Sequence, residues 1–210
     1  MFVKARPILF SGPMVQALLV GRKTQTRRPV NPQPPENPLA VGGKRWGLSE
    51  DSFFFCGIRS PYGRPGDRLW VRETLAFTDG YGWRYKADGT PLEVLAGDPC
   101  KGEAAAWCRR KYEAVSKVCP SIFMPRWASR ITLEIESIAV ERLQDLSEAD
   151  ARAEGVFGPP KSQAGWRQYP YESCHLETAK ESYATLVDSI HDRGYWESNP
   201  WVWVIGFKHL

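Results

Sequence analysis

The sequence predicts an α+β fold with a mixed, mostly antiparallel and barrel-like β-sheet, a few flanking helices and long loops. The predicted strands lie scattered between the helices, without the regular alternation that a parallel α/β sheet requires. Nine tryptophans and 17 prolines among 210 residues favour short strands and long ordered loops over a helical bundle. Hydrophobic residues make up 42% and charged residues 25%, as in a globular protein, and no apolar run approaches the ~18 residues of a membrane helix.

The N-terminal region predicts a strand, a helix and a second strand. Residues 6–10 are typical of a short strand, and apolar residues then recur at helical spacing up to residue 19. Ser11 suits the N-cap of this helix, Pro13 its first turn and Gly21 its end. The alternating residues 22–30 then favour a strand.

The middle of the chain predicts a loop followed by three strands. Residues 29–38 include five prolines, which lack amide donors, so this stretch is expected to be a surface loop. Residues 66–77 predict a turn and a strand, and residues 82–89 predict a strand that ends in an Asp-Gly turn. Residues 121–143 hold a long alternating strand. On it, Ile131, Leu133 and Ile135 share one face and Thr132, Glu134 and Glu136 the other.

The C-terminal third predicts two helices and a final strand. Residues 146–156 favour a compact helix with Ser147 as its cap and Gly155 as its stop. Residues 172–191 carry apolar residues at helical spacing and predict an amphipathic helix of several turns. Residues 199–210 predict the last strand.

Positive charge is concentrated in the first third of the chain. Residues 1–75 hold 12 Lys/Arg and 5 Asp/Glu, a net charge of +7, whereas residues 76–210 hold 16 and 19, a net charge of −3. A basic region of this kind suits an acidic partner such as nucleic acid, although chance clustering on a solvated surface gives the same count.

The cysteines and histidines predict neither a metal site nor a cofactor. The five cysteines are odd in number, form no CxxC pair, and lie at Cys56, Cys100, Cys108, Cys119 and Cys174. Zinc sites need four close ligands, usually in paired spacing, and the three histidines show no catalytic triad with a serine or cysteine. Free thiols and the lack of a signal-peptide pattern favour a reducing cytoplasm.

The segment from Gly21 to Arg28 is the first candidate for chemistry. In an extended strand Thr24, Thr26 and Arg28 share one face, and Lys23, Gln25 and Arg27 share the other. Four cations in eight residues repel one another unless an anion or carboxylates lie nearby. The alternative is an exposed basic edge strand that blocks aggregation.

Two other segments are candidates for a site. Glu154 falls in the last turn of its predicted helix, where the helix dipole disfavours an anion, so it is either an ordinary solvated side chain or the partner of a cation elsewhere. Arg126 and Arg130 flank Trp127, a combination suited to phosphates and a stacked base. The alternative for that segment is a core tryptophan between surface ion pairs.

Four blocks of the sequence together resemble the ASCH domain family. They are GRKTQTRR at 21–28, GDRLWVRE at 66–73, LSEADARAEGV at 146–156 and WVWVIGFKHL at 201–210. The resemblance implies one PUA-like β-barrel domain over residues 1–210, with insertions at about 29–65, 78–120 and 157–175. The longer chain also resembles ASCH-like proteins frequent in bacteriophage and prophage genomes, which implies the cytoplasm of a bacterial host.

The resemblance also implies an activity. Small ASCH proteins are amidohydrolases that remove the acetyl group from 4-acetylcytidine, with a catalytic Lys and Thr from the GRKTxT strand and a Glu from the short helix. These fall on Lys23, Thr26 and Glu154. We therefore expect a hydrolase that needs no metal or cofactor and acts on an acylated cytidine nucleoside or modified base. Expected contacts to the nucleoside or RNA are Arg22, Thr24, Arg27, Arg28, Arg72, Arg126 and Trp127.

The family leaves other functions open. Some members are linked to RNA cleavage and others to RNA binding without catalysis, so a ribonuclease and a non-catalytic reader of RNA or modified bases are the alternatives. A structural role in phage assembly would require a large exposed apolar patch. If the catalytic Lys and Thr lie on a strand surface and the Glu at a helix end, substituting each should cost no more than ~1 kcal/mol of stability.

Overall fold

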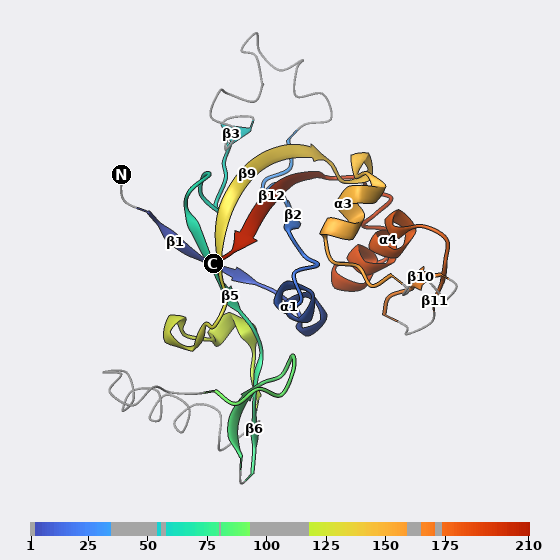
Figure 1. Cartoon of the computed structure of the whole chain (residues 1–210). Coiled ribbons are helices and arrows are strands. Elements are labelled where there is room, and N and C mark those ends of the chain that lie inside the picture. Colours follow the sequence, from blue (N-terminus) through green and yellow to red (C-terminus); the bar gives the residue numbers. More distant parts are fainter. Residues whose placement is uncertain are drawn as a thin grey trace.

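The computed structural model describes residues 3–34, 54–55, 58–79, 81–92, 118–158, 165–170 and 174–210. These residues form an α+β protein with three α-helices and a five-stranded mixed main sheet (Figure 1). In spatial order its strands are β1 (Ala5–Leu9), β5 (Arg68–Arg72), β9 (Thr132–Arg142), β12 (Trp201–His209) and β2 (Gln25–Pro29). The pair β1–β5 is parallel and the other three pairs are antiparallel. The mixed, mostly antiparallel sheet is therefore as the sequence predicts.

The expectation of a β-barrel needs correction, because the main sheet does not close within the described residues. Its two edge strands, β1 and β2, form no backbone pair there. They meet through a side chain: Arg28 of β2 donates from Nη2 to the carbonyl of Leu9 in β1. The Arg28 guanidinium also lies 5.2 Å from the ring centre of Phe10. A side-chain bridge thus stands where a barrel would have a ladder of hydrogen bonds.

Helix α1 (Gly12–Leu19) connects these two edge strands and packs on the face of the main sheet that forms the main core. It buries Val15 and Leu18 in the main core, as the helical spacing predicts. Ser11 occupies the N-cap, although its side chain forms no capping hydrogen bond, and Gly21 has a positive φ of 71° after the helix end. The predicted alternation on β9 is confirmed, since Ile131, Leu133 and Ile135 are buried while the residues between them are not.

Helices α3 (Glu148–Ala153) and α4 (Ala179–Ile190) pack together over a second apolar core at one end of the sheet (Figure 1). Each starts with a reciprocal capping box, at Ser147 and Thr178 respectively. The prediction of a helix over 172–191 starts too early. The chain first forms strand β11 (Cys174–Leu176), paired with β10 (Trp166–Arg167), and the Thr178 cap fixes the true start of the helix.

A small second sheet extends from the end of β5. It contains β6 (Leu75–Thr78), β7 (Gly82–Tyr85) and β8 (Val118–Cys119), in the order β7-β6-β8. Arg130 joins it to the main sheet: Nε and Nη2 donate to the two oxygens of Glu73 at 2.9 and 2.8 Å, and Nη1 donates to Asp88 at 2.8 Å. The Arg130 guanidinium lies 3.9 Å from the ring centre of Tyr85.

The long strand expected within residues 121–143 is confirmed as β9, Thr132–Arg142. Two 3₁₀ turns, Ser121–Phe123 and Arg126–Ala128, precede it, and each follows a proline that cannot donate to a ladder. A third 3₁₀ turn, Leu143–Asp145, follows β9.

Large parts of the predicted insertions at 29–65, 78–120 and 157–175 lie outside the described residues. Besides the elements above, the described parts hold the two-stranded hairpin of β3 (Phe54–Phe55) and β4 (Ile58–Arg59). No helix among the described residues is long and apolar enough to cross a bilayer.

Candidate functional site

Lys23 and Glu154, two of the three predicted catalytic residues, form a buried ion pair. Lys23 lies directly before β2 and Glu154 caps the C-terminus of α3. The Lys23 Nζ atom lies 2.7 Å from Glu154 Oε2 and donates a second hydrogen bond, of 2.8 Å, to the Glu154 carbonyl. The two side chains are only 0% and 2% exposed, so Glu154 is the partner of a cation and not a solvated side chain, and the alternative of an exposed basic edge strand is wrong at Lys23.

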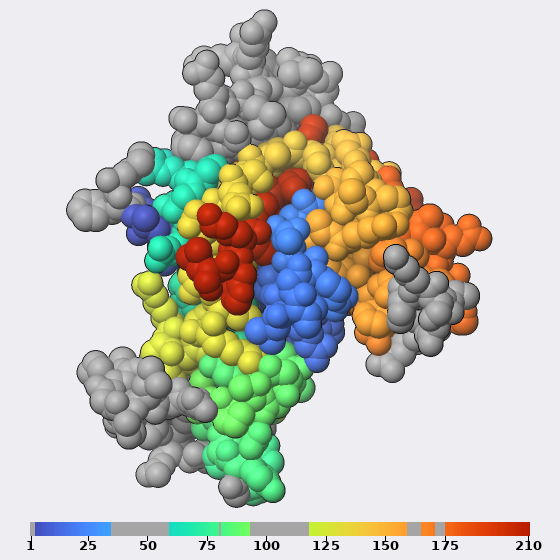
Figure 2. Space-filling model, viewed as in Figure 1, coloured from blue at the N-terminus to red at the C-terminus, as the bar shows by residue number. Residues whose placement is uncertain are grey.

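Gly155 brings the two backbones close enough for this pair. Its φ is +85°, and a Cβ atom there would lie 2.9 Å from the Cβ atoms of both Ala17 and Lys23. The Thr24 amide adds a 2.9 Å hydrogen bond to the carbonyl of Ala153. Figure 2 shows the blue segment that holds α1 packed beside the gold region of α3. The end of α3 therefore touches the α1–β2 connection because residue 155 has no side chain.

Arg27 extends the pair into a network of charges. Its Nη1 donates to Glu154 Oε1 at 3.2 Å, and its Nε and Nη2 donate to Glu141 Oε1 at 2.8 and 2.6 Å. Asp150 Oδ2 lies 3.6 Å from Arg27 Nη2, and Gln25 donates to Asp150 Oδ1 at 3.1 Å. Both oxygens of Glu154 therefore accept from a cation. Lys23, Gln25 and Arg27 all reach α3, as their shared strand face predicts.

Sequence reasoning missed Glu141 and Asp150 as members of this network. Glu141 belongs to β9, and only the sheet order brings it near β2, since β12 lies between these two strands. The spacing of residues in the sequence does not reveal that Glu141 and Arg27 lie close together. Asp150 binds Ser147 at the cap of α3, and its second role depends on how α3 docks.

Thr26 is buried, at 2% exposure, but the structure does not connect it to the ion pair. Its backbone pairs with Ile205 of β12, and it belongs to the strand face opposite Arg27. Within the described residues the Thr26 hydroxyl forms no hydrogen bond to Lys23 or Glu154. The structure thus brings Lys23 and Glu154 together, and it shows no hydrogen bond from the Thr26 hydroxyl to either of them.

The pKa of the Lys23 amine is below its ordinary value of 10.5, and the main cause is burial. The Glu154 carboxylate acts to raise this pKa, whereas the nearby charges of Arg28 and Arg27 act to lower it. For Arg27, burial also acts to lower the pKa, but Glu154 and Glu141 outweigh it and the pKa is raised. Lys23 is therefore the cation of this network that most readily gives up its proton.

The predicted nucleic-acid contacts fall into two separate groups. Arg22 and Thr24 are exposed beside the network, and Arg28 is half-buried over Phe10. Arg22 lies 5.5 Å from the ring centre of Phe157. The second group is Arg72, Arg126 and Trp127, and it lies near the small sheet, well separated from α3 in Figure 1.

In this second group the structure gives each residue a different role. Arg72 donates to the Ile122 carbonyl at 3.1 Å and lies 4.7 Å from the Trp70 ring centre. Arg126 is exposed, whereas Trp127 is half-buried and packs on the apolar core beneath the small sheet. For Trp127 the structure therefore favours the alternative of a tryptophan that packs on a core.

A cavity of about 390 Å³ lies between the start of α1 and the small sheet. Its lining residues are Ser11, Gly12, Pro13, Gln16, Glu73, Thr74, Lys86 and Ala87. Ser11 follows Phe10, and the Lys23 Nζ atom lies 5.5 Å from the ring centre of Phe10. Phe10 is therefore the chain neighbour of a residue that lines the cavity, and its ring lies near the buried amine.

Comparison of the chain with protein-family models, with curated proteins and with solved structures finds no match. Among the described residues no group of three or more histidine, cysteine or acidic side chains is placed to hold a metal ion.

Proposed function

We propose that the protein is an amidohydrolase that removes an acyl group from the exocyclic amine of a cytidine-like nucleoside or modified base. The observation that carries the proposal is the buried Lys23 amine, whose pKa is lowered by burial and which Glu154 holds in place. Because its pKa is lowered, this amine gives up its proton more readily than an ordinary lysine, and the deprotonated form can act as a general base. The resemblance of the GRKTQTRR, GDRLWVRE, LSEADARAEGV and WVWVIGFKHL blocks to ASCH amidohydrolases supports the same class, including its PUA-like fold.

The proposed reaction is hydrolysis of an amide. The oxygen of water adds to the acyl carbonyl while Lys23 takes its proton. The alternative nucleophile is the Thr26 hydroxyl, which lies on the other strand face and must first turn toward Lys23. The C–N bond then breaks, the proton passes to the leaving nitrogen, and the products are a carboxylic acid and the free cytidine. If Thr26 attacks first, a water molecule releases the acyl group from its oxygen in a second step.

Glu154 acts in this scheme as a positioning residue. Both its oxygens already accept hydrogen bonds from the cations Lys23 and Arg27, which makes the carboxylate a weaker base toward water. We place the substrate in the 390 Å³ cavity, which falls in the size range of small-ligand sites. The Phe10 ring must move for an acyl group to reach the enclosed amine.

Hydrolysis of acylated cytidines, followed by chromatography of the free cytidine, tests the proposal. Thr26→Val and Lys23→Met should each abolish turnover, and Thr26→Ser should retain it. Lys208→Gln, which alters a 51% exposed amine, is the matched control and should leave turnover unchanged. Glu154→Gln should shift the acidic limb of the pH–rate profile to lower pH, because that limb reports loss of the proton from Lys23 and the carboxylate raises the pKa of Lys23. Full turnover by folded Lys23→Met protein would overturn the proposal.

A second candidate, a non-catalytic reader of RNA or modified bases, is favoured by one observation. The Lys23 amine is fully enclosed and both of its described acceptors belong to Glu154, an arrangement that also suits a purely structural pair. A reader would bind labelled single-stranded RNA in an anisotropy titration and release no cytidine. Fragments of the same RNA on a denaturing gel would instead indicate a ribonuclease.

A further inference from the structure

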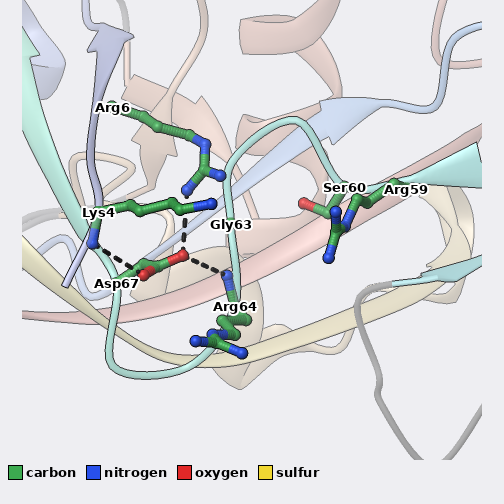
Figure 3. Close-up of a pocket in the computed structure, with 7 residues that line it drawn as sticks. All are labelled: Lys4, Arg6, Arg59, Ser60, Gly63, Arg64 and Asp67. Carbon is green, nitrogen blue, oxygen red and sulfur yellow. Dashed lines mark hydrogen bonds and ion pairs between the residues drawn. The ribbon is translucent and has the colours of Figure 1, made fainter. Parts of the chain in front are cut away.

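A small basic cavity of about 100 Å³ lies beside β1, the edge strand opposite β2 (Figure 3). Its lining residues are Lys4, Arg6, Arg59, Ser60, Gly63, Arg64 and Asp67. Four of these side chains are cationic and one is anionic, a net charge of +3. None of Lys23, Thr26 and Glu154 lines this cavity, so the inference below does not depend on the proposed hydrolase.

Strand alternation explains why cations gather here. Lys4, Arg6 and Ile8 share one face of the N-terminal segment, and Ile8 is buried in the main core. The same face presents Arg6 and Lys4 where the strand extends beyond that core. In Figure 3 both side chains run from β1 toward the loop that carries Gly63.

Asp67 organises the cavity and does not neutralise it. Its buried carboxylate accepts from the Lys4 amide at 3.1 Å, Arg6 Nη1 at 3.0 Å and the Arg64 amide at 3.3 Å. Burial raises its pKa, but these hydrogen bonds outweigh that effect and lower it, so the carboxylate is ionised at neutral pH. A Cβ on Gly63 would lie 2.6 Å from Arg6 Nη1 and 2.7 Å from Asp67 Oδ2, so only glycine lets the loop approach this pair.

Three other cations line the cavity besides Arg6, and the two that matter here are Lys4 and Arg64. Within the described part of the chain, the Lys4 amine and the Arg64 guanidinium form no ion pair, although both line the same cavity. Ser60, only 4% exposed, adds a hydroxyl donor. Like charges held together around a cavity attract an anion and repel one another without it.

We propose that this cavity binds a phosphate group. The cavity, with a volume of about 100 Å³, is large enough for one phosphate group. Guanidinium, amine and hydroxyl donors are the groups that bind phosphate oxygens in proteins. The phosphate belongs either to the backbone of single-stranded nucleic acid or to a small molecule such as a mononucleotide.

Binding measurements on paired charge variants test the proposal. Inorganic phosphate and cytidine monophosphate are titrated by calorimetry, and a short single-stranded RNA by anisotropy, at several salt concentrations. In the test variant, Lys4→Gln with Arg64→Gln, the bonds to Asp67 persist because they use the backbone amides of residues 4 and 64. The control, Arg193→Gln with Lys208→Gln, removes the same charge from exposed positions elsewhere.

The test variant should weaken binding of the phosphate-bearing probe at least about tenfold, and the control less than about twofold. If the site holds a nucleic-acid backbone, RNA binds more tightly than the monophosphate, and the test variant reduces the salt slope by about 1. If it holds a small molecule, phosphate and the monophosphate lose affinity while RNA binding is unchanged. Wild-type protein that binds none of the three probes, or equal losses in test and control, would overturn the proposal.

Discussion

At residue 23 the protein encloses an amine that would normally remain in water. The pair with Glu154 makes this tolerable, but two buried charges stabilise a fold only while both are present. The sequence-based expectation of ~1 kcal/mol for substituting either residue is therefore too small, because it assumed exposed side chains. A pattern of residue types does not reveal which cation a folded chain will enclose.

A double-mutant cycle measures this coupling. Glu154→Leu alone should cost about 3–5 kcal/mol in the free energy of unfolding, because Lys23 is left charged and buried without its carboxylate. Lys23→Met combined with Glu154→Leu should cost less than the sum of the two single substitutions by at least about 1 kcal/mol. Urea denaturation of the four proteins gives these values. Additive costs would show that the two residues act independently.

Among the elements, α3 depends most on one glycine for its position. Gly155→Ala should cost more than the 1–2 kcal/mol typical of a left-handed non-glycine residue, since the new Cβ also meets Ala17 and Lys23 at 2.9 Å. Gly194→Ala is the matched control, because Gly194 has almost the same φ, +86°, and nothing within 4 Å of the added atom. Thermal unfolding compares the two. Equal losses would mean that the close packing at Gly155 does not position α3.

Local signals explain which elements the sequence predicts well. The cap at Ser147, the stop at Gly155 and the alternation of Ile131 and Leu133 act within a few residues, and the structure confirms each. The start of α4 was placed too early because the apolar spacing continues into β11, which only its pairing with β10 defines. Sheet order, and with it the approach of Glu141 to Arg27, depends on contacts between distant segments and could not be predicted.

On the scale of the whole molecule, Arg130 joins the two sheets by binding Glu73 and Asp88 together. Hydrogen bonds from Arg130 lower the pKa of Asp88 to about 2, although burial acts to raise it. A carboxylate with a depressed pKa stabilises the fold above its unfolded pKa of 3.8, and that contribution is lost as the pH falls toward 2.

Asp88→Asn should therefore reduce the free energy of unfolding at pH 7, and its difference from wild type should shrink between about pH 4 and pH 2. Urea denaturation at several pH values gives the two curves. Glu136→Gln, which removes the charge of an exposed carboxylate on β9, is the control and should follow the wild-type curve. A difference between Asp88→Asn and wild type that is independent of pH would contradict this role.

The place of β12 between β9 and β2 also constrains when the protein can fold on the ribosome. Strand β2, which carries Arg27, pairs with β12 as its sheet neighbour, and residues 25–29 are synthesised roughly 170 residues before residues 201–209. At the usual rate of translation this is a delay of ~10–35 s. During that time the nascent chain holds a basic segment whose sheet partner does not yet exist. The main sheet that surrounds the Lys23–Glu154 pair is complete only after nearly the whole described chain has emerged. A stalled or shortened translation product therefore exposes the GRKTQTRR segment without β12, its sheet partner.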